Sequence, residues 1–347
     1  MNAAGEATSA PPASLSPRSE RLPGLEALRG VAAICVLLLH IGAIFQLQPI
    51  MAKGYLGVDF FLMLSGFLMA RVQEPRLASG KLPTWQFLVK RYRRLWPMMA
   101  LGGLIGLPFL WIRTTGMGQF ALIAITNLAL LPWFTLGTEV FPLNIPAWTI
   151  FFEMVANTVH ALILRLLPSV ALAGGALLCL PLLWFIGEAY GDFDVGSRPD
   201  NFHAGFPRIL FAYLIGIALG RWWRGGPSIP VPALPAIAAM PLILLAAQHL
   251  GFDHWTFDLL FVALACPMMI AGALRLNSMD TAARLLGKLS FPLFALQMPI
   301  LQGLRRLGFE AFESGLAAFG GGIGGAVLAS ALGRWRRRRL PLREATA

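Results

Sequence analysis

Residues 31–47 read VAAICVLLLHIGAIFQL, an apolar run in which His40 is the only titratable side chain apart from Cys35. A helix needs about 20 largely apolar residues to cross the hydrocarbon core of a bilayer. Similar runs recur almost to the C-terminus of the 347-residue chain, which is 57% hydrophobic and 13% charged with a mean hydropathy of +0.67. This composition excludes a soluble globular domain and predicts an all-α polytopic membrane protein.

Basic residues at the segment ends decide which apolar runs cross. The positive-inside rule places both termini in the cytoplasm. The basic loops between them then also fall on the cytoplasmic side only if one segment between residues 95 and 147 does not cross the membrane. That segment is 118–134, which contains Asn127 and Pro132. We therefore predict ten transmembrane helices plus one re-entrant or interfacial segment. The apolar segments are 31–47, 55–70, 95–112, 118–134, 147–165, 169–187, 205–220, 231–249, 257–274, 289–304 and 315–333.

The flanking regions differ in composition from the membrane domain. Residues 1–20 are rich in Ala, Ser and Pro and predict a disordered cytoplasmic tail, and residues 334–347 predict a basic cytoplasmic tail. The membrane domain then covers residues 21–333. Within it, residues 75–94 mix basic and aromatic side chains, which predicts a cytoplasmic amphipathic helix lying in the headgroup plane and framing an entrance.

The net charge of +11 does not indicate a nucleic-acid partner, because the Lys and Arg residues gather at segment ends, where they meet lipid headgroups. The three cysteines lie in apolar runs, and neither a disulfide framework nor zinc-ligand spacing is present. We expect no bound metal. The glycine run 320–325 in the last segment is typical of close helix packing.

Ionisable groups at bilayer depth are costly and therefore indicate function. Arg29 and His40 are eleven residues apart, which puts them on one face of a helix and about 16.5 Å apart along it. Asp59 and Glu153 place carboxylates in two further segments, and Asn157 follows Glu153 one helical turn on. A carboxylate beside an imidazole can orient it as a general base. We also interpret the acidic loop around His203, with Asp192, Asp194 and Asp200, as solvated.

Several stretches, in order, resemble the acyltransferase-3 family of bacterial membrane O-acyltransferases, over roughly residues 21–333. The matching stretches are Leu25-Glu26-Ala27-Leu28-Arg29-Gly30 with His40, Gly57-Val58-Asp59-Phe60-Phe61 through Ser65-Gly66-Phe67, the basic motif Phe87, Arg91, Arg94 and Pro97, and Trp148 with Glu153. Thr149 stands where the family often has Ser, and Gln297 replaces the His of a late motif.

The resemblance implies an acyl-CoA donor, usually acetyl-CoA, bound from the cytoplasm, and an acceptor hydroxyl on a glycan or related molecule. It also implies a bacterial inner membrane and no permanently bound cofactor. Carried over by position, Arg29 and His40 would be the catalytic pair, while Arg91 and Arg94 would hold the CoA phosphates. We expect Asp59 and Glu153 to assist catalysis.

We expect the substrate-binding residues to be Ser65, Trp148, Asn157 and Gln297. His40 acts either as a general base or as a transient acyl carrier. The alternative function is a transporter or flippase that lines its path with the same charges, and its partners would then be lipid-linked or small-molecule substrates.

Overall fold

The computed structural model describes residues 22–47, 50–223, 230–276 and 280–339. This part of the chain is a bundle of helices joined by turns and by longer loops at 129–146 and 191–201, and no strand occurs in it. The helices in the first half are α1 (Pro23–Phe45), α2 (Leu56–Leu68), α3 (Glu74–Ala78), α4 (Thr84–Trp111), α5 (Met117–Leu128) and α6 (Ala147–Leu162). Those in the second half are α7 (Ser169–Tyr190), α8 (Gly205–Trp222), α9 (Ala233–Leu250), α10 (Trp255–Leu260), α11 (Cys266–Ala273), α12 (Asp280–Arg306) and α13 (Ala311–Arg339).

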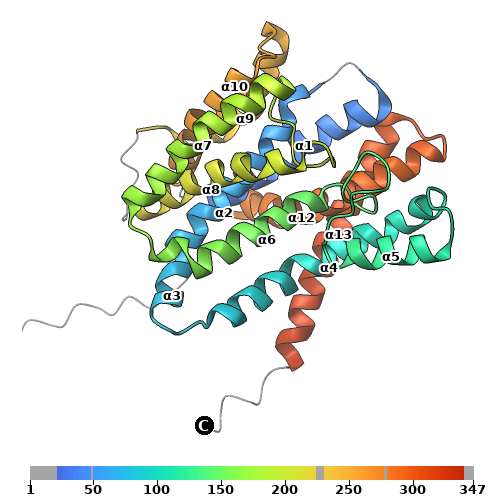
Figure 1. Ribbon diagram of the computed structural model, residues 1–347, viewed down its shortest axis with the longest axis horizontal. Helices are drawn as coiled ribbons and strands as arrows, with labels where there is room; N and C mark the ends of the chain where they lie inside the picture. Colours follow the sequence, from blue (N-terminus) through green and yellow to red (C-terminus); the bar gives the residue numbers. More distant parts are fainter. Residues whose placement is uncertain (1–21, 48–49, 224–229, 277–279, 340–347) are drawn as a thin grey trace, which may run out of the picture.

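Two close helix pairs form the centre of the bundle. α1 packs most extensively against α12, and α2 against α8 (Figure 1). Glycines allow the second pair to approach, because a Cβ atom at Gly216 would overlap the carbonyl oxygen of Met63 and one at Gly66 would overlap that of Tyr213. In Figure 1, α7, α9 and α10 cover one flank of these pairs, and α5 and α13 lie on the other.

The prediction of an all-helical membrane protein is confirmed. Eight of the helical stretches are long and apolar enough to span a membrane. The other two predicted crossings, 95–112 and 289–304, fall within α4 and α12, which carry charged residues. The exact number of ten therefore stays a prediction. The segment 118–134 forms only the 12-residue α5, about 18 Å long, which is too short for a ~30 Å hydrocarbon core.

The single amphipathic helix predicted over 75–94 is instead divided between the end of α3 and the start of α4. The short α3 ends at Ala78, the chain turns at Gly80 with φ +70°, and α4 then begins at Thr84. From there α4 continues without a break through Pro97 to Trp111, so the basic segment and the apolar segment form one helix. The predicted tail 1–20 lies outside the described residues, and α13 extends past 333 to Arg339.

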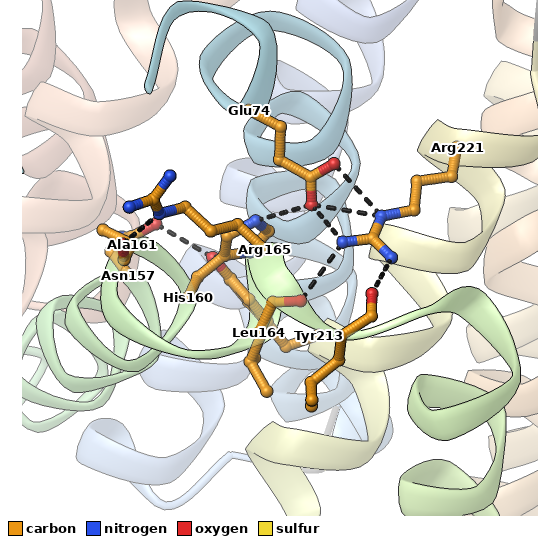
Figure 2. Close-up of polar contacts among 9 residues, drawn as sticks. Glu74, Asn157, His160, Ala161, Leu164, Arg165, Tyr213 and Arg221 are labelled. Atoms are coloured by element: carbon orange, nitrogen blue, oxygen red, sulfur yellow. Dashed lines mark hydrogen bonds and ion pairs between the residues drawn. The ribbon is translucent and has the colours of Figure 1, made fainter. Parts of the chain in front are cut away.

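A polar network fixes the position of α3 (Figure 2). The carboxylate of Glu74, the first residue of α3, lies 2.9 Å from Nε2 of His160 on α6 and accepts a 2.7 Å hydrogen bond from Nη2 of Arg221 on α8. The Tyr213 hydroxyl lies 3.2 Å from the other ring nitrogen of His160 and donates to Asn157 at 3.1 Å. Three helices therefore hold the turn that leads into the basic start of α4.

Candidate functional site

An arginine-lined cavity of ≈90 Å³ lies between α1, α2, α4, α6 and α12, and we call it the arginine cavity. Arg29, Arg91 and Arg94 line it together with Glu153 and Ser65. Arg91 and Arg94 are three residues apart, and this spacing puts both on one face of α4. Three guanidinium groups against one carboxylate leave the cavity strongly cationic.

One of these arginines is fixed by its neighbours. Nη2 of Arg91 donates to Ser65 Oγ at 2.7 Å and forms an ion pair with Glu153. Ser65 Oγ in turn donates to the Glu153 carboxylate at 3.1 Å. Such charge-assisted contacts hold a guanidinium in a defined orientation. The sequence led us to expect that Glu153 orients the imidazole of His40 or the acceptor, whereas the structure places its carboxylate against Arg91.

A wider basic cavity of ≈350 Å³ continues from the arginine cavity, because Arg91 and Arg94 line both. Its other charged residues are Arg76, Lys81 and Lys90, which come from the end of α3, the turn after it and α4. This basic cavity lies at the end of the bundle where α3 meets the start of α4 (Figure 1). Polyanionic groups such as phosphates suit a site of this kind.

A third cavity of ≈190 Å³ lies toward the other end of α1, and we call it the histidine cavity. His40 lines it, and Nδ1 of this residue is buried without a hydrogen-bond partner among the described residues. Trp148 and Tyr55 also line it. Thr149 and Phe294 line both this cavity and the arginine cavity. The two sites are therefore separated by a thin wall of side chains.

Two loops close the far side of the histidine cavity. The loop before α6 contributes Glu139, and the loop after α7 contributes Asp194 and Arg198. A hydrogen bond of 3.0 Å from the Val140 N–H to the Ser197 carbonyl joins the two loops. The acidic pair of Glu139 and Asp194 is thus held against the cavity that contains His40.

Burial changes the titration of both carboxyl groups. It raises the pKa of Glu139 to about 7, with nearby Asp194 adding to the rise and Arg198 and Arg113 opposing it. Burial likewise raises the pKa of Asp194 above its ordinary range, although Arg208 and Arg198 oppose this. Removing a carboxylate from water disfavours its charged form, which explains both directions. In the loop that the sequence indicates to be solvated, Asp200 and His203 are exposed and Asp194 is half-buried.

The remaining predicted site residues lie elsewhere. Asp59 forms a buried ion pair with Arg208, whose Nη2 donates at 2.7 Å and Nε at 3.0 Å. Asn157 is fully buried in the network around Glu74 and donates to the Glu153 carbonyl at 2.7 Å. Gln297 is fully buried too, and its amide atoms have no hydrogen-bond partner among the described residues.

Sequence reasoning missed Glu139, Arg208 and Phe294. Arg208 carried a usable signal, since it is a charge near the start of the apolar segment 205–220. Glu139 and Phe294 carried none, because an acidic loop residue and a phenylalanine in a helix are ordinary in a membrane protein. Among the described residues, no group of three or more His, Cys, Asp or Glu side chains could hold a metal ion.

Comparison with known proteins identifies the family. The chain is 33% identical over 159 residues to "Protein 2 in picA locus" of Rhizobium radiobacter, covering 41% of this chain and 82% of that one. It is 21% identical over 263 residues to the "Putative membrane-bound transacylase BcsY" of Komagataeibacter xylinus, covering 70% of this chain and 60% of that one. No solved structure matches. Residues 22–335 match the acyltransferase domain of the acyltransferase-3 family, and the chain therefore belongs to this family of membrane acyltransferases.

Proposed function

We propose that this protein transfers an acyl group, in the first place acetyl, from acyl-CoA to a hydroxyl group of a cell-surface glycan. The observation that carries the proposal is the pair of cavities separated by Thr149 and Phe294. One cavity is lined by arginines, and the other contains an imidazole. A donor and an acceptor can therefore approach the same wall from opposite ends of the bundle.

The donor fits the cationic side. CoA carries several phosphates and a long, thin pantetheine arm that ends in the thioester. The basic cavity offers Arg76, Lys81 and Lys90 to the phosphates. Arg91 and Arg94 stand where it joins the arginine cavity, and guanidinium groups bind phosphate oxygens in bidentate fashion. The narrower arginine cavity, of ≈90 Å³, then receives the end of the arm that carries the thioester.

The chemistry requires a base beside the acceptor. In this proposal, neutral His40 removes the proton from the acceptor hydroxyl as its oxygen attacks the thioester carbonyl carbon. The C–S bond then breaks, and the CoA thiolate takes up the proton that His40 received. A new ester bond to the acceptor replaces the thioester. Arg29, at the donor end of the same face of α1, would help to hold the donor.

Acetyl-CoA turnover by the purified protein in nanodiscs tests this function. We expect CoA release with wild type, retained acetyl-CoA binding but lost turnover with His40→Ala, and weakened binding with Arg29→Ala. His203→Ala is the matched control, because His203 is exposed in the loop after α7. Full turnover by a folded His40→Ala variant would overturn the proposed role of His40. Movement of a substrate across the bilayer without acyl-CoA consumption would instead support a transporter.

A further inference from the structure

The loop side of the histidine cavity has features that the acyl transfer itself does not require. Glu139 and Asp194 face His40 across the cavity, and Arg198 is the cationic side chain that lines it with them. With both carboxyl groups ionised, the cavity lining therefore has two negative charges and one positive charge. Arg208 also acts on Asp194, but it is paired with Asp59 and does not line the cavity. Arg113 acts on Glu139 and does not line the cavity either. The aromatic side chains of Tyr55 and Trp148 line the same cavity.

The size of the cavity limits what can occupy it. The cavity has a volume of ≈190 Å³, which is enough to admit a single sugar ring. Several of the residues that line the cavity have polar or charged side chains, among them His40, Tyr55, Glu139, Asp194 and Arg198. A lining of this kind favours a polar ligand over a hydrocarbon chain, because buried polar groups normally have hydrogen-bond partners.

We infer that the histidine cavity selects an uncharged sugar ring as the acyl acceptor, with Glu139 and Asp194 accepting hydrogen bonds from hydroxyl groups next to the one that reacts. This inference rests on the proposed acyl transfer. Carboxylates accept hydrogen bonds from vicinal hydroxyl groups, and an aromatic side chain packs against the apolar face of a sugar ring.

The same residues disfavour an anionic acceptor. A uronic acid or a phosphorylated sugar would bring its own negative charge beside two partly buried carboxylates. Like charges in a desolvated site repel strongly, and Arg198, which is exposed, offsets only part of this repulsion. The acidic pair therefore determines acceptor specificity, because it excludes anionic glycans.

The test compares two acceptors that differ at C6, where the second has a carboxylate in place of the hydroxymethyl group of the first. Acetyl transfer from acetyl-CoA to octyl β-D-glucoside and to octyl β-D-glucuronide is measured at pH 8 with the full-length protein in nanodiscs. We expect kcat/KM to be at least about tenfold higher for the glucoside with wild type. In the double variant Glu139→Gln/Asp194→Asn we expect this ratio to fall at least about fivefold, chiefly through a lower KM for the glucuronide.

A matched variant shows whether loss of any carboxylate from these loops changes the ratio. Asp200→Asn removes a carboxylate from the same loop as Asp194, but from an exposed position, and it should leave the ratio unchanged. A ratio near one with wild type, or a ratio that the double variant does not change, overturns the inference. Absence of acetylated glucoside also overturns it if CoA release continues. Absence of any acetyl-CoA binding or consumption would count against the proposed function itself.

Discussion

Arg29 and His40 lie on one helix but belong to different cavities. Arg29 lines the arginine cavity and His40 the histidine cavity, and eleven residues of α1 separate them by about 16.5 Å. The distance suits two substrates whose reactive groups meet between the residues rather than one substrate held by both. Each residue can then be tested against one substrate alone.

Replacement of Arg94 by alanine should weaken donor binding. Arg94 lines both the arginine cavity and the basic cavity, so its guanidinium can reach a donor phosphate. Loss of one charge-assisted hydrogen bond costs about 1.5–3 kcal/mol, which corresponds to roughly a 10- to 100-fold higher Kd for acetyl-CoA. Calorimetry in nanodiscs measures this change. Arg93→Ala is the control, since Arg93 lines neither cavity, and equal effects of both variants would contradict the assignment.

Asp59 should contribute to stability through its partner. Asp59 and Arg208 are both nearly fully buried, and removal of one member of a buried ion pair leaves the other charge without compensation. We expect Arg208→Met to lower the free energy of unfolding by about 3–5 kcal/mol and the double variant Asp59→Leu/Arg208→Met to recover part of the loss. Thermal unfolding in detergent measures both. An unchanged Tm in the single variant would show that the pair is not stabilising.

The sequence could indicate some of these residues and not others. His40 and Glu153 are conspicuous because polar or charged groups are rare in apolar segments. Glu139 is not conspicuous, because carboxylates are common in loops. Only the contact between the loops, marked by the hydrogen bond from Val140 to Ser197, places it in the cavity. The sequence also does not indicate which side chains form ion pairs. Glu153 could therefore be predicted as functional but not as the partner of Arg91.

At the scale of elements, α4 and the α2–α8 pair determine where the cavities form. α4 carries its basic residues in the first turns and continues directly into the bundle, so the side chains proposed to bind the donor phosphates have a rigid support. The sequence predicted two separate helices here, because a change from basic to apolar composition resembles a boundary. Helix continuity depends on backbone hydrogen bonds, and Pro97 close to this change did not interrupt the helix.

The close approach of α2 and α8 should be sensitive to one methyl group. A Cβ atom at Gly216 would overlap the Met63 carbonyl oxygen, so Gly216→Ala forces the helices apart. Overpacking of this kind costs about 1–3 kcal/mol, which should appear as a lower Tm in detergent. Gly324→Ala in α13 is the control, because nothing lies within 4 Å of that Cβ position. Equal Tm values for the two variants would contradict this account of the packing.

For the whole molecule, composition and hydropathy were enough to predict an all-helical membrane bundle, and the charges of the loops led to the prediction that 118–134 does not cross. The number of crossings was harder to predict. α4 and α12 combine an apolar stretch with charged ends, and no simple measure of length and composition separates a spanning helix from a partly buried one. The mutual arrangement of the three cavities depends on contacts between distant segments, which the order of the motifs does not contain.

The charge at the entrance to the histidine cavity should vary with pH near neutrality. Burial raises the pKa of Glu139 to about 7 in the presence of Arg113, Arg198 and Asp194. Across the cavity its other polar neighbours are His40 and Tyr55. Below pH 7 the Glu139 side chain is mostly protonated and neutral, and above pH 7 it is mostly a carboxylate. The repulsion of an anionic acceptor therefore increases as the pH rises.

The preference for octyl glucoside over octyl glucuronide should consequently rise from pH 6 to pH 8. The glucuronide stays ionised throughout, because carboxyl groups titrate near pH 4. A ratio of the two kcat/KM values cancels pH effects on the chemical step, which both acceptors share. Glu139→Gln should make the ratio independent of pH in this range, whereas Asp200→Asn should preserve the rise. A pH-dependent ratio that survives in Glu139→Gln would assign the titration to another group, and Asp194 would be the next to test.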